Sequence, residues 1–104
     1  MSLIDKSTPS EIRIAFEADY IWGETTLAFK ELLRQQLEVA VREVHLELAS
    51  VKFMDSSAVG TLLQLVQTLT KYHRKVHIDH PSDEMRHILA NLQLEPFLVI
   101  DEGG

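Results

Sequence analysis

The chain of 104 residues alternates between two hydrophobic periods, and this alternation limits the fold more than any other feature. A period of two opens with Ile12, Ile14 and Phe16 and returns at residues 44–50 and 75–80, as expected of strands. An almost continuous apolar run at 97–102 predicts a last strand. Strands that alternate with helices form a mostly parallel sheet with right-handed crossovers. The predicted class is therefore α/β.

Three helices are expected in the intervals between these strands, because apolar residues recur there at steps of three and four. The first follows Gly23, and Thr25 or Thr26 is expected to cap it. The second follows the polar segment at residues 55–57. The third follows Pro81, with Ser82 as its cap.

The length is that of one domain, since domains contain about 50–250 residues. We expect a single domain over residues 1–104, with helices packed on one face of a mixed, mostly parallel sheet. Residues 1–10 and 102–104 are expected to be frayed ends, although further strand content before Ile12 stays open.

Composition excludes several classes of site. The absence of cysteine excludes disulfides, thiolate nucleophiles and cysteine-ligated zinc. A net charge of −6 disfavours non-specific binding to nucleic acid or anionic lipid. The basic residues Lys71, Arg74 and Lys75 are expected to form a solvated helix end. No run approaches the ~18 apolar residues of a membrane span, so we expect no membrane insertion. The expected location is the cytoplasm, with which the absence of cysteine is compatible.

The stretch "VKFMDSSAVG", residues 51–60, places Asp55, Ser56 and Ser57 where a strand turns into a helix. In open α/β sheets this edge is where ligands and partners usually bind. A helix cap needs only one of the three polar residues. Because helix N-termini also accommodate phosphate, an exposed serine here is a candidate phosphoacceptor.

Hydrolytic chemistry is not expected at Ser56. A nucleophile elbow has glycines two residues before and after the serine, whereas this chain has Met54 and Ala58. No histidine–acid pair is placed by the segment. We expect a protein that is not an enzyme.

The histidines predict no metal site and no cofactor. On a strand, His77 and Asp79 share one face while His80 points to the other, and His87 lies across a turn. These side chains are expected to be solvated or to act as caps. His45 and His73 suggest nothing further.

An aromatic pair and a methionine have two interpretations each. Trp22 and Tyr20 are either an exposed partner-binding pair, since aromatic residues are enriched in binding hot spots, or a cover for the edge of the core. Met54 either makes adaptable contacts at an exposed turn or is buried beside Phe53.

The segment "VHLELASVKFMDSSAVGTLLQLVQTL" resembles the central signature of the STAS family, in particular the bacterial anti-sigma factor antagonists. The resemblance implies that the serine directly after the aspartate, Ser56, is the phosphoacceptor. Gly60 corresponds to the second glycine of the family pattern. Ala58 replaces the first glycine and is expected to add a methyl group at the rim of the interface. Asp19 is the nearest acid in a first turn that departs from the family pattern.

The same resemblance implies a regulatory binding module. Its unphosphorylated form would bind a GHKL-type serine kinase that is also the anti-sigma factor, and phosphorylation of Ser56 would release it. A metal-dependent serine phosphatase would reset the switch, and ATP and Mg²⁺ would belong to the kinase. The contact surface is expected around residues 55–60 and 19–23, including Trp22.

The alternative is a constitutive STAS subunit of a lipid-transport complex or a larger signalling assembly, in which the serines only pack or dock. The oligomeric state stays open.

Overall fold

The computed structural model describes residues 3–102 and confirms the predicted α/β class. The strands of the main sheet are β1 (Leu3–Asp5), β2 (Glu11–Phe16), β4 (Glu43–Glu47), β6 (Val76–Asp79) and β7 (Leu98–Asp101). The helices are α1 (Gly23–Val39), α2 (Ser56–Lys71) and α3 (Asp83–Asn91), and a short 3-10 helix, η1 (Glu95–Phe97), precedes β7. The strands β3 (Tyr20–Ile21) and β5 (Phe53–Met54) pair with each other in a separate two-stranded sheet.

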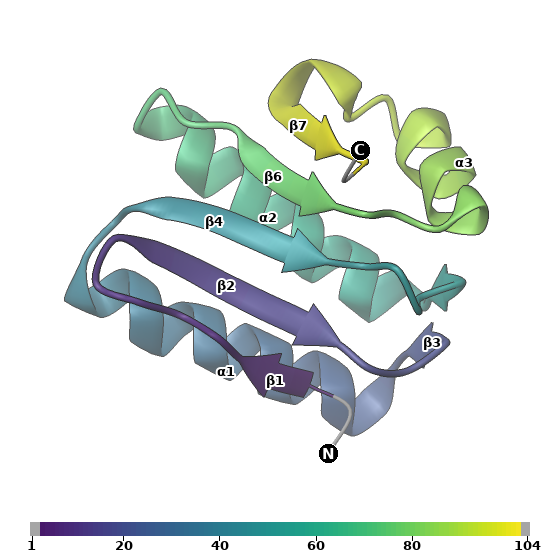
Figure 1. The fold of residues 1–104 in the computed structure, drawn as a ribbon, viewed down its shortest axis with the longest axis horizontal. Coiled ribbons are helices and arrows are strands. Elements are labelled where there is room, and N and C mark those ends of the chain that lie inside the picture. Colours follow the sequence, from purple (N-terminus) through teal and green to yellow (C-terminus); the bar gives the residue numbers. More distant parts are fainter. Residues whose placement is uncertain (1–2, 103–104) are drawn as a thin grey trace.

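The main sheet has the order β1-β2-β4-β6-β7. Only β1 is antiparallel to its neighbour, and all the other pairs are parallel. In Figure 1, α1 and α2 lie behind the sheet, and the face toward the viewer carries no helix. The sheet is therefore mixed and mostly parallel with helices packed on one face, as predicted.

Along each central strand, successive side chains point to opposite faces of the sheet, so the two faces differ in character. Toward the helices the strands present apolar side chains that are almost fully buried: Ile12, Ile14, Phe16, Val44, Leu46, Val76 and Ile78. They pack against α1 and α2, and the ring of Phe16 meets that of Phe29 edge-on at 5.0 Å. Complete burial of each large side chain contributes about 1.5–3 kcal/mol, so this layer holds the helices on the sheet.

The opposite face of the sheet, which we call the open face, carries polar side chains instead. They are Glu11, Arg13, Glu43, His45, Glu47, His77 and Asp79, and they form ion pairs and hydrogen bonds with one another. The open face is thus a connected polar surface.

The expected fraying of residues 1–10 is wrong for the described part of that segment. Leu3–Asp5 pairs with β2, and Leu3 is buried. The turn that follows is fixed by the backbone bond from Thr8 N–H to Glu11 O (2.8 Å) and by the Arg42 guanidinium, which donates to Thr8 O (3.1 Å). Strand pairing and a buried arginine therefore order this segment. Residues 1–2 and 103–104 lie outside the described residues.

The expected cap of the first helix is also wrong. α1 begins at Gly23, so Thr25 and Thr26 lie inside its first turn, and the N-cap position, Trp22, makes no side-chain capping bond. Gly23 has a φ of +53°, in the left-handed region that favours glycine. This glycine turns the chain from β3 directly into α1.

The cap of the third helix is confirmed. Ser82 is the N-cap of α3 and its hydroxyl oxygen accepts the N–H of Met85 at 3.1 Å. The same hydroxyl donates to Val51 O. It therefore joins α3 to the loop that leads into β5.

Candidate functional site

The segment Asp55-Ser56-Ser57 forms the beginning of α2, with Asp55 as its N-cap. The Asp55 carboxylate accepts the Ala58 N–H at 2.9 Å and the Ser57 hydroxyl at 2.7 Å. These bonds favour the ionised carboxylate. The Ser57 hydroxyl is the largest cause, followed by the Ala58 N–H, and together they hold the pKa of Asp55 below its ordinary value. Asp55 and Ser57 therefore supply the local cap.

Ser56 is not used by this cap. Its side chain is exposed on the first residue of α2. Within residues 3–102 its hydroxyl makes no side-chain hydrogen bond, in contrast to the hydroxyl of Ser57. The two serines thus differ: one is part of the helix start, and the other offers a free hydroxyl to solvent.

Two of the predicted contact residues are not on the surface. Met54 points from β5 into the core and is buried. Ala58 lies on the inner side of the first turn of α2 and is also fully buried. The expectation that the Ala58 methyl group lies at the rim is therefore wrong, because this position of the helix faces the core.

Gly60, by contrast, is exposed on α2. A methyl group built on its Cα would meet no atom within 4 Å, and its φ is not in the left-handed region. Neither packing nor backbone conformation therefore requires glycine here.

The turn at residues 19–22 lies directly beside this segment. β3 and β5 are parallel neighbours, with Tyr20 opposite Phe53, and Asp19 O accepts the backbone N–H groups of Lys52 (2.7 Å) and Phe53 (3.1 Å). The backbone N–H of Asp55 in turn donates to Ile21 O at 3.0 Å. The structure therefore places the two predicted contact segments side by side.

Tyr20, Trp22 and Phe53 form a surface group, which we call the aromatic cluster. Their exposed fractions are 40%, 60% and 53%. The rings of Tyr20 and Trp22 stack at 6.0 Å, and Tyr20 lies 5.3 Å from Phe53. Of the two interpretations of Tyr20 and Trp22, the exposed pair therefore agrees with the structure. Phe53 was not predicted, although its position next to the inward-pointing Met54 on a strand implies an outward side chain.

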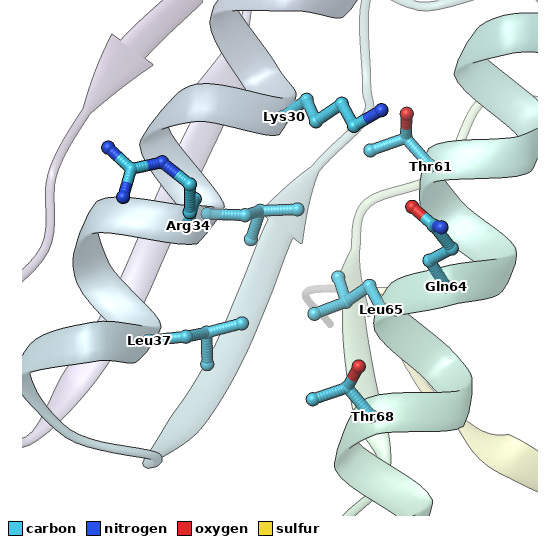
Figure 2. A pocket seen from close by; sticks show the side chains of 8 residues that line it. Lys30, Arg34, Leu37, Thr61, Gln64, Leu65 and Thr68 are labelled. Atoms are coloured by element: carbon cyan, nitrogen blue, oxygen red, sulfur yellow. The ribbon is translucent and has the colours of Figure 1, made fainter.

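A groove of about 240 Å³ separates α1 from α2 on the helix side. Figure 2 shows Lys30 and Thr61 facing each other at one end and the aliphatic side chains of Leu37 and Leu65 further along. Thr61 also donates its hydroxyl to Ser57 O at 3.0 Å, so the groove begins one turn after Ser57. The lining contains no carboxylate and no imidazole: Lys30, Leu33, Arg34, Leu37, Thr61, Gln64, Leu65 and Thr68.

A second group of reactive side chains lies on the open face. His45 is 9% exposed, and its ring stacks on that of His77 at 4.4 Å. Glu43 Oε1 lies 2.5 Å from His45 Nε2 and 3.8 Å from His77 Nε2. On the other side of the ring, His45 Nδ1 lies 3.0 Å from Asp79 Oδ2. His45, for which the sequence suggested nothing, is thus enclosed by carboxylates.

The remaining histidines stay apart from this group. His73, His80 and His87 are exposed, and the first two have positive φ values outside the strands. The basic residues Lys71, Arg74 and Lys75 are exposed at the C-terminal end of α2, as predicted. Among the described helices, none has the length and apolar character needed to cross a membrane.

Comparison with known proteins supports the fold and identifies the family. One similar solved structure is a Thermotoga maritima protein provisionally described as an anti-sigma factor antagonist, with a TM-score of 0.70 and 15% identity over 86% of this chain and 78% of that chain. At this identity the likeness concerns the fold alone. A search of curated proteins gives no significant match. The model of the STAS domain matches residues 10–102, so the chain belongs to the STAS domain family.

Proposed function

We propose that this protein is a phosphorylation-switched binding module of the anti-sigma factor antagonist type. Its unphosphorylated form binds and sequesters a GHKL-type serine kinase that is also an anti-sigma factor, and phosphorylation of Ser56 releases that partner. The observation that carries the proposal is the free, exposed hydroxyl of Ser56 at the start of α2, beside the exposed aromatic cluster.

Ser56 is a better acceptor than Ser57 on physical grounds. A kinase must reach the hydroxyl and place a phosphate on it, and Ser56 has no side-chain partner among the described residues that would have to be displaced. Modification of Ser57 would remove the hydroxyl that Asp55 accepts at 2.7 Å. It would also bring a phosphate directly against that carboxylate. Phosphorylation at Ser56 therefore disturbs the start of α2 less.

The aromatic cluster supports a protein partner on the same surface. Aromatic side chains are enriched among the residues that dominate binding energy, and these three are partly exposed around the backbone that joins Asp19 to Asp55. Gly60 adds a second argument. An exposed helical glycine that packing does not require leaves room for a partner to approach the backbone closely.

Phosphorylation acts mainly at this interface. It adds about −1.5 to −2 charges to a chain whose net charge is −6. A helix N-terminus favours a nearby negative charge by roughly 0.3–1 kcal/mol, so the fold tolerates the phosphate. A partner surface that fits a neutral hydroxyl must instead desolvate the phosphate beside Asp55. A cost of about 3–4 kcal/mol there lowers affinity several-hundred-fold, since about 1.4 kcal/mol is a factor of ten.

In this proposal the protein is not an enzyme and acts in the cytoplasm. The kinase supplies ATP and Mg²⁺, and a metal-dependent serine phosphatase restores the binding form. No nucleic acid is a partner, in agreement with the negative net charge.

Affinity capture from lysates of the native cells tests the proposal. The baits are the wild type, Ser56→Asp and Gln67→Glu, with recovered proteins quantified by mass spectrometry. Gln67 is exposed on the same helix, so Gln67→Glu adds one negative charge away from the start of α2. We expect the wild type and Gln67→Glu to recover the kinase equally, and Ser56→Asp to recover at least about tenfold less.

Equal recovery by all three baits would contradict the switch. If the common partner were then a transport ATPase rather than a kinase, the constitutive subunit would be the better description. In that case Asp55, Ser56 and Ser57, which we call the D-S-S segment, cap the helix and dock without modification.

A further inference from the structure

We propose that Glu43, His45 and His77 form a binding site for a divalent transition-metal ion, with Zn²⁺ as the type case. The site lies on the open face of the sheet, which carries no helix, whereas Ser56 begins α2 on the helix side (Figure 1). It is independent of the phosphorylation proposal, because it shares no residue with the aromatic cluster or the D-S-S segment.

The sheet register brings the three side chains together. His45 of β4 lies directly opposite His77 of the parallel strand β6, and Glu43 precedes His45 by two residues on the same face. One ligand atom from each residue can be chosen so that all three lie within 4.8 Å of one another. Three of the four ligands of a tetrahedral ion are therefore already adjacent.

The distances fit an ion after small side-chain movements. Zinc binds imidazole nitrogen at about 2.0–2.1 Å and carboxylate oxygen at about 2.0–2.2 Å, which places tetrahedral ligand atoms about 3.3 Å apart. Glu43 Oε1 is 2.5 Å from His45 Nε2 and 3.8 Å from His77 Nε2. The Glu43 side chain is about half exposed and free to shift between them. Glu11 Oε2, 3.5 Å from His45 Nε2, or a water completes the set.

The surroundings of His45 are those of an oriented metal ligand. Asp79 is buried, and its carboxylate lies 3.0 Å from His45 Nδ1, so a proton on Nδ1 donates to Asp79 and directs the Nε2 lone pair toward Glu43 and His77. Arg13 holds Asp79 in place at 2.5 Å. A carboxylate behind a metal-binding imidazole is the usual supporting arrangement.

The charge of this face also favours a cation. Three carboxylates lie within 4 Å of a ring nitrogen of His45 or His77, those of Glu11, Glu43 and Asp79. Arg13 pairs with two of them, those of Glu11 and Asp79. Two imidazoles with one carboxylate prefer zinc and related transition metals over Mg²⁺ or Ca²⁺, which take oxygen ligands. The chemical class is therefore a first-row divalent ion.

Titration calorimetry on the full chain without an affinity tag tests the site, with ZnCl₂ as the probe and MgCl₂ as the comparison. The variants are His77→Gln and Glu43→Gln, which remove ligands at partly exposed positions. His87→Gln is the matched control, because His87 is an exposed histidine on α3. Circular dichroism establishes that each variant is folded.

We expect one equivalent of Zn²⁺ to bind the wild type and His87→Gln alike, with no heat from Mg²⁺. Each ligand variant should weaken binding at least tenfold, and Asp79→Asn should weaken it about 10–100-fold through the orientation of His45. Absence of Zn²⁺ binding by the wild type at about 100 µM would overturn the proposal. Unchanged affinity in both folded ligand variants would overturn it equally.

Discussion

Ser56 and Ser57 are adjacent in the chain, but the surroundings of their hydroxyls differ. Ser57 donates to Asp55 at 2.7 Å, whereas Ser56 is exposed at the first position of α2. The residue pattern indicates that a helix cap needs one of the three polar residues, but it does not indicate which residue forms the cap or what the other two do. The structure assigns the capping interaction to Asp55 and Ser57.

This difference predicts a change in the pKa of Asp55. Ser57→Ala removes the largest cause of the lowered value, so the pKa of Asp55 should rise toward its ordinary value of 3.8, while Ser56→Ala should leave it unchanged. Carboxyl-detected NMR titration of the three proteins measures it. Because the folded pKa is depressed, the ionised carboxylate stabilises the fold above the ordinary pKa, and this contribution is lost as the pH falls through the folded value. Equal values in all three proteins would contradict the assigned bond.

Trp22 gives a second prediction at this scale. If the aromatic cluster contacts the partner, Trp22→Ala should reduce recovery of the kinase about tenfold or more. The free energy of unfolding should change by only about 0.5 kcal/mol, since Trp22 is largely exposed. Tyr72→Ala is the control, because Tyr72 is 56% exposed at the opposite end of α2. Equal recovery with both variants would place the partner elsewhere.

Residue types and spacing predicted Asp55, Ser56 and Ser57 at a helix start, and the structure agrees. They left open whether Met54 is buried and did not predict the burial of Ala58. Whether a side chain near a turn points into the core depends on where the strand ends and the helix begins. If that boundary moves by one residue, an inward-pointing side chain becomes an outward-pointing one. The exposure of Phe53 depends on the same boundary, because Phe53 and Met54 are neighbours on β5 and point in opposite directions.

At the scale of elements, the pattern predicted the three helices and the strands of the parallel sheet, because each has a clear period. It did not predict the start of α1 or the pairing of β3 with β5. Gly23 enters the helix with a positive φ instead of a side-chain cap, and two-residue strands are too short for a period to appear. The short pair nevertheless brings the turn at residues 19–22 beside the D-S-S segment.

Substitution by alanine should change the free energy of unfolding in opposite directions at Gly60 and at Gly23. Gly60→Ala should stabilise the fold by roughly 0.5–1 kcal/mol, because alanine is the better helix former and no atom lies within 4 Å of the added methyl group. Gly23→Ala should destabilise it by about 1–2 kcal/mol, because its φ is +53°. Urea unfolding measures both. Capture with Gly60→Ala should recover less kinase despite the greater stability, and undiminished recovery would remove Gly60 from the interface.

For the whole molecule, we expect phosphorylation of Ser56 to change the affinity for the partner strongly without refolding. Ser56→Asp places a negative charge at the N-terminus of α2, where the helix dipole favours it. We expect amide NMR shifts confined to the start of α2 and the adjacent β3–β5 pair, and a change in the free energy of unfolding within about 1 kcal/mol. Shifts spread across the main sheet would instead indicate a conformational switch.

The open face shows what a sequence cannot supply at this scale. β5, α2 and the loops around them separate His45 from His77 in the chain, and only the pairing of β4 with β6 places the two histidines opposite each other. The sequence predicts that both strands belong to one sheet, but their neighbour relation and register come from the fold. The sequence suggests nothing for His45, and only the fold shows that its ring is buried and stacks on that of His77.

The phosphorylation stoichiometry of the protein isolated from its own cells distinguishes a switch at Ser56 from a constitutive binding module. Mass spectrometry would compare the wild type with Ser56→Ala and Ser57→Ala across growth conditions. We expect a phosphate on the wild type and on Ser57→Ala, and none on Ser56→Ala. A phosphate retained by Ser56→Ala, or its absence from the wild type under every condition, would contradict the switch.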